Sequence, residues 1–498
     1  MASYLRRFGG HDMALKNWLQ HNLLWLFFFL ALFIALCFPI QDGDLFFYLS
    51  MGRLIFETGT IPATDAFLFS FQDWHVYHEW LSYLFFYGSY YLGGYAGVIL
   101  LKAILWMAAF AGILFCARRW KVQDLLICAV LILVAVTCSH RFVERASLFS
   151  DLLLALLTAI LLGPKLPPRK IQWLFPLIFV FWVNTHGGFP AGLLLITAYV
   201  ILKGKNSPGW LWLTLVFSYL SCLVNPDFLQ GALYPFRTIF KPEWAIYRTM
   251  NTEWLPTFQS AFLSTWEVKS LIVLILVSGS LVIFKLWKNP RQNLFILFVF
   301  VMNLYLAQNA SRFMCTSALG FSLVILTALR SINWKIPQRL EAGFKVVFSV
   351  GLLGLTVWIF NFGYRPASGM REFGFGVDLP SFPTKAVQFI KDHQLKGHFF
   401  NQYEWGSYLI WNLDLKKSFF IHSHIDNPLY FKNDYYGMSR SQDFFDQSVK
   451  KYDINYFVLD RGRLATNPPP GILVSLNRYK LIYDDGLAVI FQTDQASK

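Results

Sequence analysis

The chain has 498 residues, of which 56% are hydrophobic and 18% aromatic. Only 14% are charged, against about a quarter in an ordinary soluble protein, which excludes a single water-soluble domain. The formal net charge of +14 raises the question of a nucleic-acid partner, but no single soluble segment combines a basic face with base-stacking aromatic residues. We therefore expect a polytopic membrane protein with no nucleic-acid partner.

Charge-poor apolar stretches recur along the first 363 residues and are long enough to cross a lipid bilayer. The first stretch is long and aromatic and lacks a small-x-small cleavage motif, so we expect it to be retained as a span. The sequence predicts eleven transmembrane helices, at residues 23–40, 95–117, 124–139, 147–163, 171–184, 189–202, 209–224, 268–284, 293–308, 313–329 and 345–363.

The basic residues predict how these spans are oriented. Lys and Arg concentrate in residues 1–22 and in every second loop after them, whereas the alternate loops hold far fewer. The positive-inside rule then places the N-terminus in the cytoplasm, and an odd number of spans places the C-terminal segment outside it. We expect an integral protein of a bacterial inner (plasma) membrane.

Residues 364–498 have a different pattern from the spans. A helix-like stretch near 383–395 is followed by GHFF, SFFI, NYFVLD, KLIYD and LAVIF, which are typical of short strands. We predict two domains, a transmembrane domain over 1–363 and an extracytoplasmic α/β domain over 364–498. All six cysteines lie in or beside spans, so no disulfide framework is predicted.

The first predicted external region, 41–94, is rich in acids and in amphipathic helical sequence. Its loop 41–79 holds six acidic residues against one basic residue, Arg53, and the stretch from Leu45 to Phe56 is apolar enough to lie on the membrane surface. Asp44 stands at the start of that stretch, two residues after Asp42. Such a carboxylate either caps the helix or acts as a general base or cation ligand, and the spacing leaves both interpretations open.

The other end of this loop carries His75, His78 and Glu79, whose spacing places them on one face if the segment is helical. They are candidate ligands of a divalent metal ion or residues that cap and orient the next helix. Further polar residues follow the later spans on the same side of the membrane. They are Arg141, Glu144, Arg145, Asn184, His186, Arg237, Lys241, Arg248, Glu253 and Arg312.

One acidic loop and several separate cationic residues on one side of the membrane suit a particular reaction. Arg, Lys and His can hold an anionic lipid phosphate while a carboxylate takes the proton of an acceptor hydroxyl or amine. Glycosyl transfer from a polyprenyl-phosphate sugar has these requirements. It needs no Gly-rich nucleotide-binding loop, and the sequence contains none.

Several of these motifs together resemble the GT-C superfamily of membrane glycosyltransferases. The first span is followed by Asp42-Gly43-Asp44, Tyr48 and Gly59-Thr60-Ile61-Pro62, and the chain ends in an α/β tail. HEWLSYLFFY, NTHGGF and FNQYEWGSYLIW add a similarity to a bacterial group of GT-C-like proteins of poorly defined function. Two departures are Gly43, which separates the acids of the usual adjacent pair, and the lack of a WWD-type motif, which argues against an oligosaccharyltransferase.

The resemblance implies a GT-C-like enzyme that uses a polyprenyl-phosphate-linked sugar in contact with membrane lipids and an unknown acceptor. Asp44 is the first candidate for the base and Asp42 the second. Candidate residues for the donor phosphate are Arg141, Arg312, His186 and Arg237. Candidates for binding the acceptor or a divalent cation, Mg²⁺ or Mn²⁺, are Tyr48, His75, His78, Glu79 and Glu253.

The tail contains a second candidate site at Glu404 and Trp405, followed by His422, His424 and Asp426. If the last three lie on a strand, their alternation makes them face one way, as a metal or sugar site requires. The alternative is a polar strand end that packs on the membrane domain.

A non-catalytic scaffold and a lipid or solute transporter are the competing functions. A transport path would need ionisable residues inside the spans. Lys102 is the clear case, and Asp151 lies near a span end. This scarcity disfavours transport.

Overall fold

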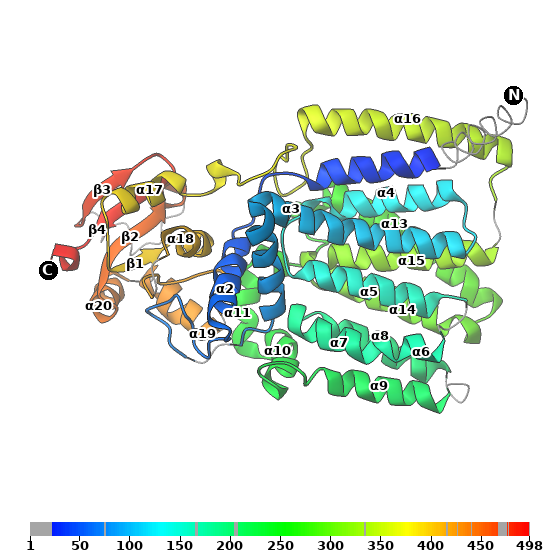
Figure 1. Cartoon of the computed structure of the whole chain (residues 1–498), viewed down its shortest axis with the longest axis horizontal. Helices are drawn as coiled ribbons and strands as arrows, with labels where there is room; N and C mark the ends of the chain where they lie inside the picture. Colours follow the sequence, from blue (N-terminus) through cyan, green and yellow to red (C-terminus); the bar gives the residue numbers. More distant parts are fainter. Residues whose placement is uncertain are drawn as a thin grey trace, which may run out of the picture.

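A computed structural model describes residues 22–73, 76–164, 168–203, 208–332, 335–414, 417–425, 427–439, 441–466, 476 and 478–497. Figure 1 shows a bundle of side-by-side helices at one end of the molecule and a small sheet-containing unit at the other. The structure confirms the predicted mostly α-helical protein with a C-terminal α/β unit. We refer to residues 364–498 as the tail and to residues 41–79 as the first loop.

Each of the eleven predicted spans overlaps a helix over most of its length. These helices are Asn22–Leu36, α3 (Trp80–Arg119), α4 (Asp124–Cys138), α5 (Ser147–Leu162), α7 (Leu174–Thr185), α8 (Phe189–Lys203), α9 (Gly209–Ser221), α13 (Trp266–Lys288), α14 (Leu294–Asn309), α15 (Met314–Ile332) and α16 (Gln338–Phe362). Five segments among the described residues are both long and apolar enough to cross a membrane: Trp80–Arg119, Asp124–Arg141, Trp266–Lys288, Ser311–Ile332 and Arg339–Phe362. The count of eleven spans therefore stays a prediction.

Helix α3 is longer than the span predicted within it. It begins at Trp80 and continues through a kink at Gly93 and Gly94 into the span. Gly94 has φ of 58°, a left-handed conformation that a residue without a Cβ adopts easily. The part before the kink leaves the bundle and packs against α2 (Asp44–Thr58).

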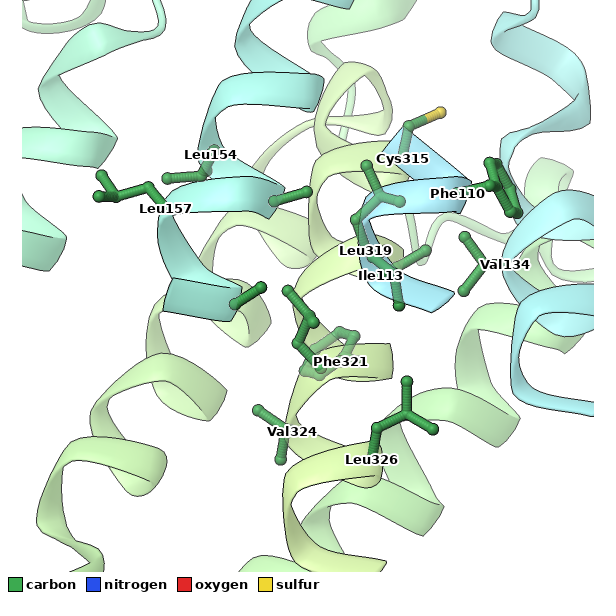
Figure 2. Packing of buried hydrophobic residues seen from close by; sticks show 14 of the residues in the cluster. Phe110, Ile113, Val134, Leu154, Leu157, Cys315, Leu319, Phe321, Val324 and Leu326 are labelled. Atoms are coloured by element: carbon green, nitrogen blue, oxygen red, sulfur yellow. The ribbon is translucent and has the colours of Figure 1, made fainter. Parts of the chain in front are cut away.

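The centre of the bundle is α15, which packs against α4, α5, α13 and α14. Its side chains Leu319, Phe321 and Val324 belong to the same buried cluster as Phe110 and Val134 of neighbouring helices (Figure 2). Lipid tails are as apolar as these side chains, so close packing holds the helices together. Apolar side chains fill the interior of the bundle. One ionic cluster, with Arg118, Asp124 and Lys345, lies at the end away from the tail, and the candidate site lies at the other end.

Short helices lie in two of the loops between the bundle helices. They are α6 (Arg169–Gln172), which precedes α7, and α10 (Leu229–Phe240), α11 (Ala245–Met250) and α12 (Ser260–Leu263), which lie between α9 and α13. Helix α2 lies between the bundle and the tail (Figure 1), with Leu45 through Gly52 all buried. Its apolar residues pack against α3 and α18 (Gly406–Leu413), so protein covers much of the helix. Its position at the membrane surface stays a prediction.

The tail contains a four-stranded sheet in the order β1-β2-β4-β3. Strands β1 (His398–Asn401) and β2 (Ile454–Asp460) are parallel, whereas β4 (Ala488–Gln492) is antiparallel to β2 and to β3 (Lys480–Asp484). The SFFI segment forms no strand, and Phe419 makes isolated bridges to Leu68 and Phe399. The remaining tail helices are α17 (Thr384–Asp392), α19 (Pro428–Tyr430), α20 (Gln442–Lys451) and α21 (Arg461–Thr466).

The first loop and the tail share one hydrophobic core. Phe46 and Leu68 from the loop belong to the same buried cluster as Phe399 and Phe420 from the tail. A fully buried hydrogen bond of 2.6 Å joins the Nε2 atom of His422 to the carboxylate of Asp65. The tail is therefore fixed against the acidic loop, and the candidate site is built where the two meet the bundle.

Candidate functional site

A cavity of about 200 Å³ lies where α2, α3, α10 and the tail converge; we call it the arginine pocket. Its charged lining residues are Asp44, Glu79, Glu253, Arg141, Arg145, Arg248 and Arg312. The four arginines outnumber the three carboxylates, so the pocket suits an anion. Tyr48, His78, His186 and His424 also line it.

Arg145 is at the centre of the ionic cluster in this pocket. Its guanidinium forms an ion pair with Asp42, lies 3.2 Å from the Oδ2 atom of Asp44 and lies 2.7 Å from Glu253. The sequence places Arg145 in a polar loop but does not single it out from Arg141. The signal that distinguishes it is a contact with residues about a hundred positions away, which the sequence does not display.

Asp42 and Asp44 have different environments. The Oδ1 atom of Asp42 accepts a hydrogen bond from the backbone N–H of Asp44, and both of its oxygens accept bonds from Arg145. The helix-start role considered for Asp44 therefore belongs to Asp42. Asp44 lines the arginine pocket, with 22% of its side chain exposed, and its Oδ2 atom contacts Arg145.

Glu253 links Arg145 to the other arginines. Its carboxylate lies 3.1 Å from Arg141, and Arg312 stacks on the neighbouring ring of Trp254 at 4.5 Å. Burial acts to raise the pKa of Glu253, but the charges of Arg141, Arg145 and Arg312 lower it below its ordinary value. The carboxylate is therefore ionised at neutral pH.

Glu79 is surrounded by three histidines from three parts of the chain. The Nε2 atoms of His78, His186 and His424 lie 3.5, 3.6 and 4.0 Å from its carboxylate oxygens. Burial alone would raise the pKa of Glu79, but the hydrogen bond and charge of His78, with His186 and His424, lower it to about 2.

The imidazoles of His186 and His424 are neutral at pH 7. Burial lowers the pKa of His186 to about 4 and that of His424 to about 3. The Nδ1 atom of His186 accepts the backbone N–H of Gly188 at 3.1 Å, so we assign the ring proton to Nε2, which faces Glu79. A neutral ring in this tautomer donates a hydrogen bond into the pocket.

A second cavity, of about 480 Å³, lies on the other side of the ionic cluster; we call it the acidic cavity. Its acids Asp42, Glu253, Glu267 and Glu404 outnumber its arginines, which are Arg141, Arg145 and Arg371. The two cavities share Arg141, Arg145 and Glu253. The segment from Asp42 to Asp44 and these shared side chains thus form a wall with one cavity on each side.

The structure brings together nine of the predicted site residues around the arginine pocket: Asp44, Tyr48, His78, Glu79, Arg141, His186, Glu253, Arg312 and His424. Asp42 lies beside them in the acidic cavity, where Glu404 and Trp405 also lie. His75 and Asp426 are outside the described residues.

Two parts of the predicted site are arranged differently from the expectation, and the role of Arg237 in binding the donor phosphate stays a prediction. Arg237 does not line the arginine pocket, because α10 presents Tyr234, Pro235 and Thr238 to it instead, and Arg248 is the basic residue there. Residues 421–425 form a turn rather than a strand, so His422 and His424 do not face one way. His422 is fully buried against Asp65, and the ring of His424 stacks on Phe47 at 4.6 Å in the pocket.

The carboxylates of this site do not fit a divalent cation well. Asp42, Asp44 and Glu253 converge on the guanidinium of Arg145, which already supplies a fixed positive charge among them. Within the described ranges, no group of three His, Cys, Asp or Glu side chains is arranged to hold a metal ion.

Comparisons with protein-family models and with curated proteins give no match. Solved structures do match. The oligosaccharyltransferase AglB of Archaeoglobus fulgidus, in complex with an inhibitory peptide and a dolichol-phosphate, superimposes with a TM-score of 0.62 and 10% identity over 91% of this chain and 70% of that one. The arabinofuranosyltransferase AftD from Mycobacteria superimposes with a TM-score of 0.54 and 13% identity. The match covers 96% of this chain and 41% of AftD. The chain has a GT-C fold.

Another GT-C structure, ArnT from Cupriavidus metallidurans in the apo state, matches over nearly its whole length. The match covers 96% of this chain and 98% of the ArnT chain, with 14% identity and a TM-score of 0.50. The GT-C fold confirms the architecture that the acidic motif and the tail predict, and the chain is an integral membrane protein. At such low identity the likeness concerns the fold alone.

Proposed function

We propose that this chain is a glycosyltransferase that moves a sugar from a polyprenyl-phosphate carrier to an extracytoplasmic acceptor, with Asp44 as the general base. The observation that carries the proposal is the position of Asp44, whose carboxylate opens into an arginine-lined pocket beside Arg145. The dolichol-phosphate in the AglB structure supports a lipid phosphate as the donor class.

The donor phosphate fits the arginine pocket. Arg312 stacks on Trp254 and Arg248 donates to the backbone oxygen of Thr238, and neither has a carboxylate within 4 Å in the described parts of the chain. Both guanidinium groups are therefore available to an anion. His186 adds a neutral Nε2–H donor at the same cavity.

The acceptor fits the acidic cavity, whose carboxylates suit hydroxyl or amine groups. Its reacting hydroxyl or amine has to reach past residues 42–44 into the arginine pocket, because Asp44 lines that pocket. In the proposed reaction the acceptor oxygen or nitrogen attacks the anomeric carbon of the donor sugar, and the bond from that carbon to the phosphate oxygen breaks. The phosphate leaves with the electron pair, and the arginines stabilise its charge as it develops. Asp44 takes the proton of the acceptor.

Asp42 and Tyr48 have positioning roles in this scheme. Asp42 accepts a hydrogen bond from the backbone N–H of Asp44 and pairs with Arg145. It therefore fixes the backbone of Asp44 and the guanidinium that Asp44 contacts. Tyr48 stacks on Tyr83 and Phe86 at 5.3 Å each, and this packing holds the helix that carries Asp44. The fixed charge of Arg145 lies among these carboxylates, so the scheme assigns no step to Mg²⁺ or Mn²⁺.

The site favours an enzyme over a scaffold or transporter. A scaffold has no need of a carboxylate that opens into a cation-lined cavity. A transport path through Lys102 is not supported, since its ammonium is fully buried and lies 2.6 Å from Glu144 in a closed pair. We place the N-terminus in the cytoplasm and the tail outside it, in the inner membrane of a bacterium.

Substitution of Asp44 tests the proposal. Asp44→Asn keeps the shape of the side chain but removes the base, so we expect transfer to fall by about 10²–10⁴-fold. The readout is the lipid extract of a deletion strain complemented with each variant, in which mass spectrometry measures accumulated lipid-linked sugar. Asp73→Asn, an exposed acid of the same loop, is the matched control. Full activity of Asp44→Asn, or no accumulation in the deletion strain, would contradict the proposal.

A further inference from the structure

A third cavity lies within the tail and has no part in the proposed transfer chemistry. Its volume is about 350 Å³, within the range of about 300–1,000 Å³ typical of small-molecule sites. The side chains that define it are Tyr403, Tyr435, Tyr436, Glu404, Asp460 and Arg463, and we call it the tyrosine cavity.

The tyrosine cavity has the position of a ligand site in an α/β sheet. The parallel strands β1 and β2 end at Asn401 and Asp460, and the cavity lies just beyond these two ends. Ligands of open α/β sheets bind beyond the carboxyl ends of their strands. One wall is a five-residue π-helix, Phe431–Tyr435, a rare element that is frequent at functional sites.

The aromatic side chains offer apolar faces to a ligand. The rings of Tyr435 and Tyr436 are 5.3 Å apart and nearly perpendicular, with an interplanar angle of 83°. Tyr436 keeps 36% of its surface exposed, although it packs against Phe431 at 4.8 Å. The ring of Tyr435 stacks on Phe400 and Phe431, and its hydroxyl accepts the backbone N–H of Tyr403 at 2.9 Å. Tyr436 is therefore the ring that presents an apolar face to a ligand.

The polar side chains supply both donors and acceptors at the rim. Glu404 pairs with Arg463 at 2.7 Å and accepts a hydrogen bond from Gln402 at 3.1 Å. The side chains of Glu404 and Arg463 are 45% and 58% exposed, so both can bind a ligand without leaving a buried charge. Two carboxylates, those of Glu404 and Asp460, accompany one guanidinium, which disfavours an anionic ligand.

Aromatic faces combined with carboxylate and guanidinium groups match the two surfaces of a neutral sugar ring. The axial C–H groups of a pyranose pack on aromatic rings, and its hydroxyl groups bind paired charged side chains. Glu404 also lines the acidic cavity, which contains Asp42. A chain of sugar units can therefore occupy the tyrosine cavity and extend past Glu404 toward the proposed acceptor side.

We infer that the tyrosine cavity is a saccharide subsite that holds a neutral sugar unit of the acceptor, so that the acceptor is a glycan. The role as part of an acceptor rests on the proposed function, whereas the binding of a sugar does not. The two claims can therefore be tested separately.

The test uses the full-length protein in lipid nanodiscs and saturation-transfer NMR with four soluble probes: cellotetraose, maltotetraose, mannotetraose and chitotetraose. We expect at least one probe to bind. Tyr436→Ala removes an aromatic face and Glu404→Gln removes a charge without changing shape, and each should weaken binding at least tenfold. Leu481→Ala and Glu372→Gln, two exposed tail positions outside the cavity, should leave binding unchanged.

Two results would overturn the inference: none of the four probes binds, or both cavity variants bind as the wild type does. Because Glu404→Gln is nearly isosteric, it remains informative if Tyr436→Ala fails to fold. The Asp44→Asn variant should bind the probe as the wild type does, since Asp44 lines the arginine pocket and not the tyrosine cavity. If no probe binds to the wild-type protein but Asp44→Asn abolishes transfer, only the saccharide subsite is refuted. If a probe binds as expected but Asp44→Asn is fully active, only the proposed function is refuted.

Discussion

Glu144 and Arg145 are neighbours in one short loop and belong to two different ionic environments. Glu144 pairs with Lys102 at 2.6 Å, and both side chains are fully buried. Arg145 keeps 21% of its side chain exposed and contacts three carboxylates between two cavities. The comparison shows that burial separates an ion pair that supports the structure from an ionic cluster that can meet a substrate.

The buried surroundings of Glu144 also explain how the exposed cluster around Arg145 keeps its geometry. Lys102 lies 3.7 Å from the ring of Phe38, and the guanidinium of Arg371 lies 4.3 Å from the same ring. Arg371 donates hydrogen bonds to the backbone oxygens of Ser139 and His140, at the start of the loop. The loop is thus held from the membrane side and from the tail, and Arg145 points into the cavities.

Loss of the exposed cluster should have the largest effect. Arg145→Met leaves Asp42, Asp44 and Glu253 without their shared cation, and we expect transfer to fall about 10³-fold, equivalent to about 4 kcal/mol. Arg145→Lys should be intermediate, because an ammonium keeps the charge but cannot bind several carboxylates in a planar fork. The measurement is the lipid-linked sugar assay, with Arg53→Met as the control. Equal activity of the Arg145→Met variant and wild type would remove Arg145 from the site.

Loss of the buried pair should act on stability first. Lys102→Met leaves the carboxylate of Glu144 uncompensated, which we expect to lower the free energy of unfolding by about 3–5 kcal/mol. The double variant Lys102→Met/Glu144→Leu removes both charges and should recover most of this loss. Thermal unfolding in detergent measures both variants. A double variant that is no more stable than the single one would show that the pair is not a closed structural unit.

A smaller effect should appear when the pH is lowered. His186 and His424 have pKa values of about 4 and 3 in the folded protein, below the ordinary 6.5, so the unfolded chain binds more protons between these values. Stability should therefore fall as the pH decreases from 7 to 5, by about 2 kcal/mol for each histidine. Glu79 contributes little over this range, because its pKa of about 2 in the folded protein and its ordinary value of 4.5 both lie below pH 5.

Substitution of one histidine separates this contribution from others. His424→Asn removes one such ring, while His186 and the buried His140, whose pKa is lowered to about 3, remain. The loss of stability between pH 7 and pH 5 should therefore be smaller by about 2 kcal/mol. Thermal unfolding across that range is the measurement. An unchanged pH dependence in His424→Asn would show that its ring is not buried in a neutral form.

Much of the fold could be predicted from the sequence because its signals are local. Long apolar runs mark the helices of the bundle, and short segments rich in aromatic and β-branched residues mark β1 through β4. The SFFI segment also looks like a strand, but Phe419 and its neighbours are held between the first loop and β1 and form only isolated bridges. Its conformation depends on Leu68, some 350 residues away in sequence, which no local pattern reports.

The candidate site was predictable in residue type and only partly in arrangement. Acids and cations on the loops between helices predict an ionic site, and Asp44, Glu79 and Arg312 do meet there. The different fates of His422 and His424 depend on contacts with Asp65 and with Glu79, both in the first loop. Such long-range pairs decide which of two similar residues faces a cavity.

The interface between the first loop and the tail restricts how this protein can be re-engineered. A Cβ on Gly43 would lie 3.0 Å from the backbone oxygen of Glu404, so the tail approaches the backbone between the two aspartates directly. A chimera that exchanges the tail alone would break this fit and the buried core around Leu68. Acceptor preference is therefore best transplanted by moving the loop and the tail together as one cassette.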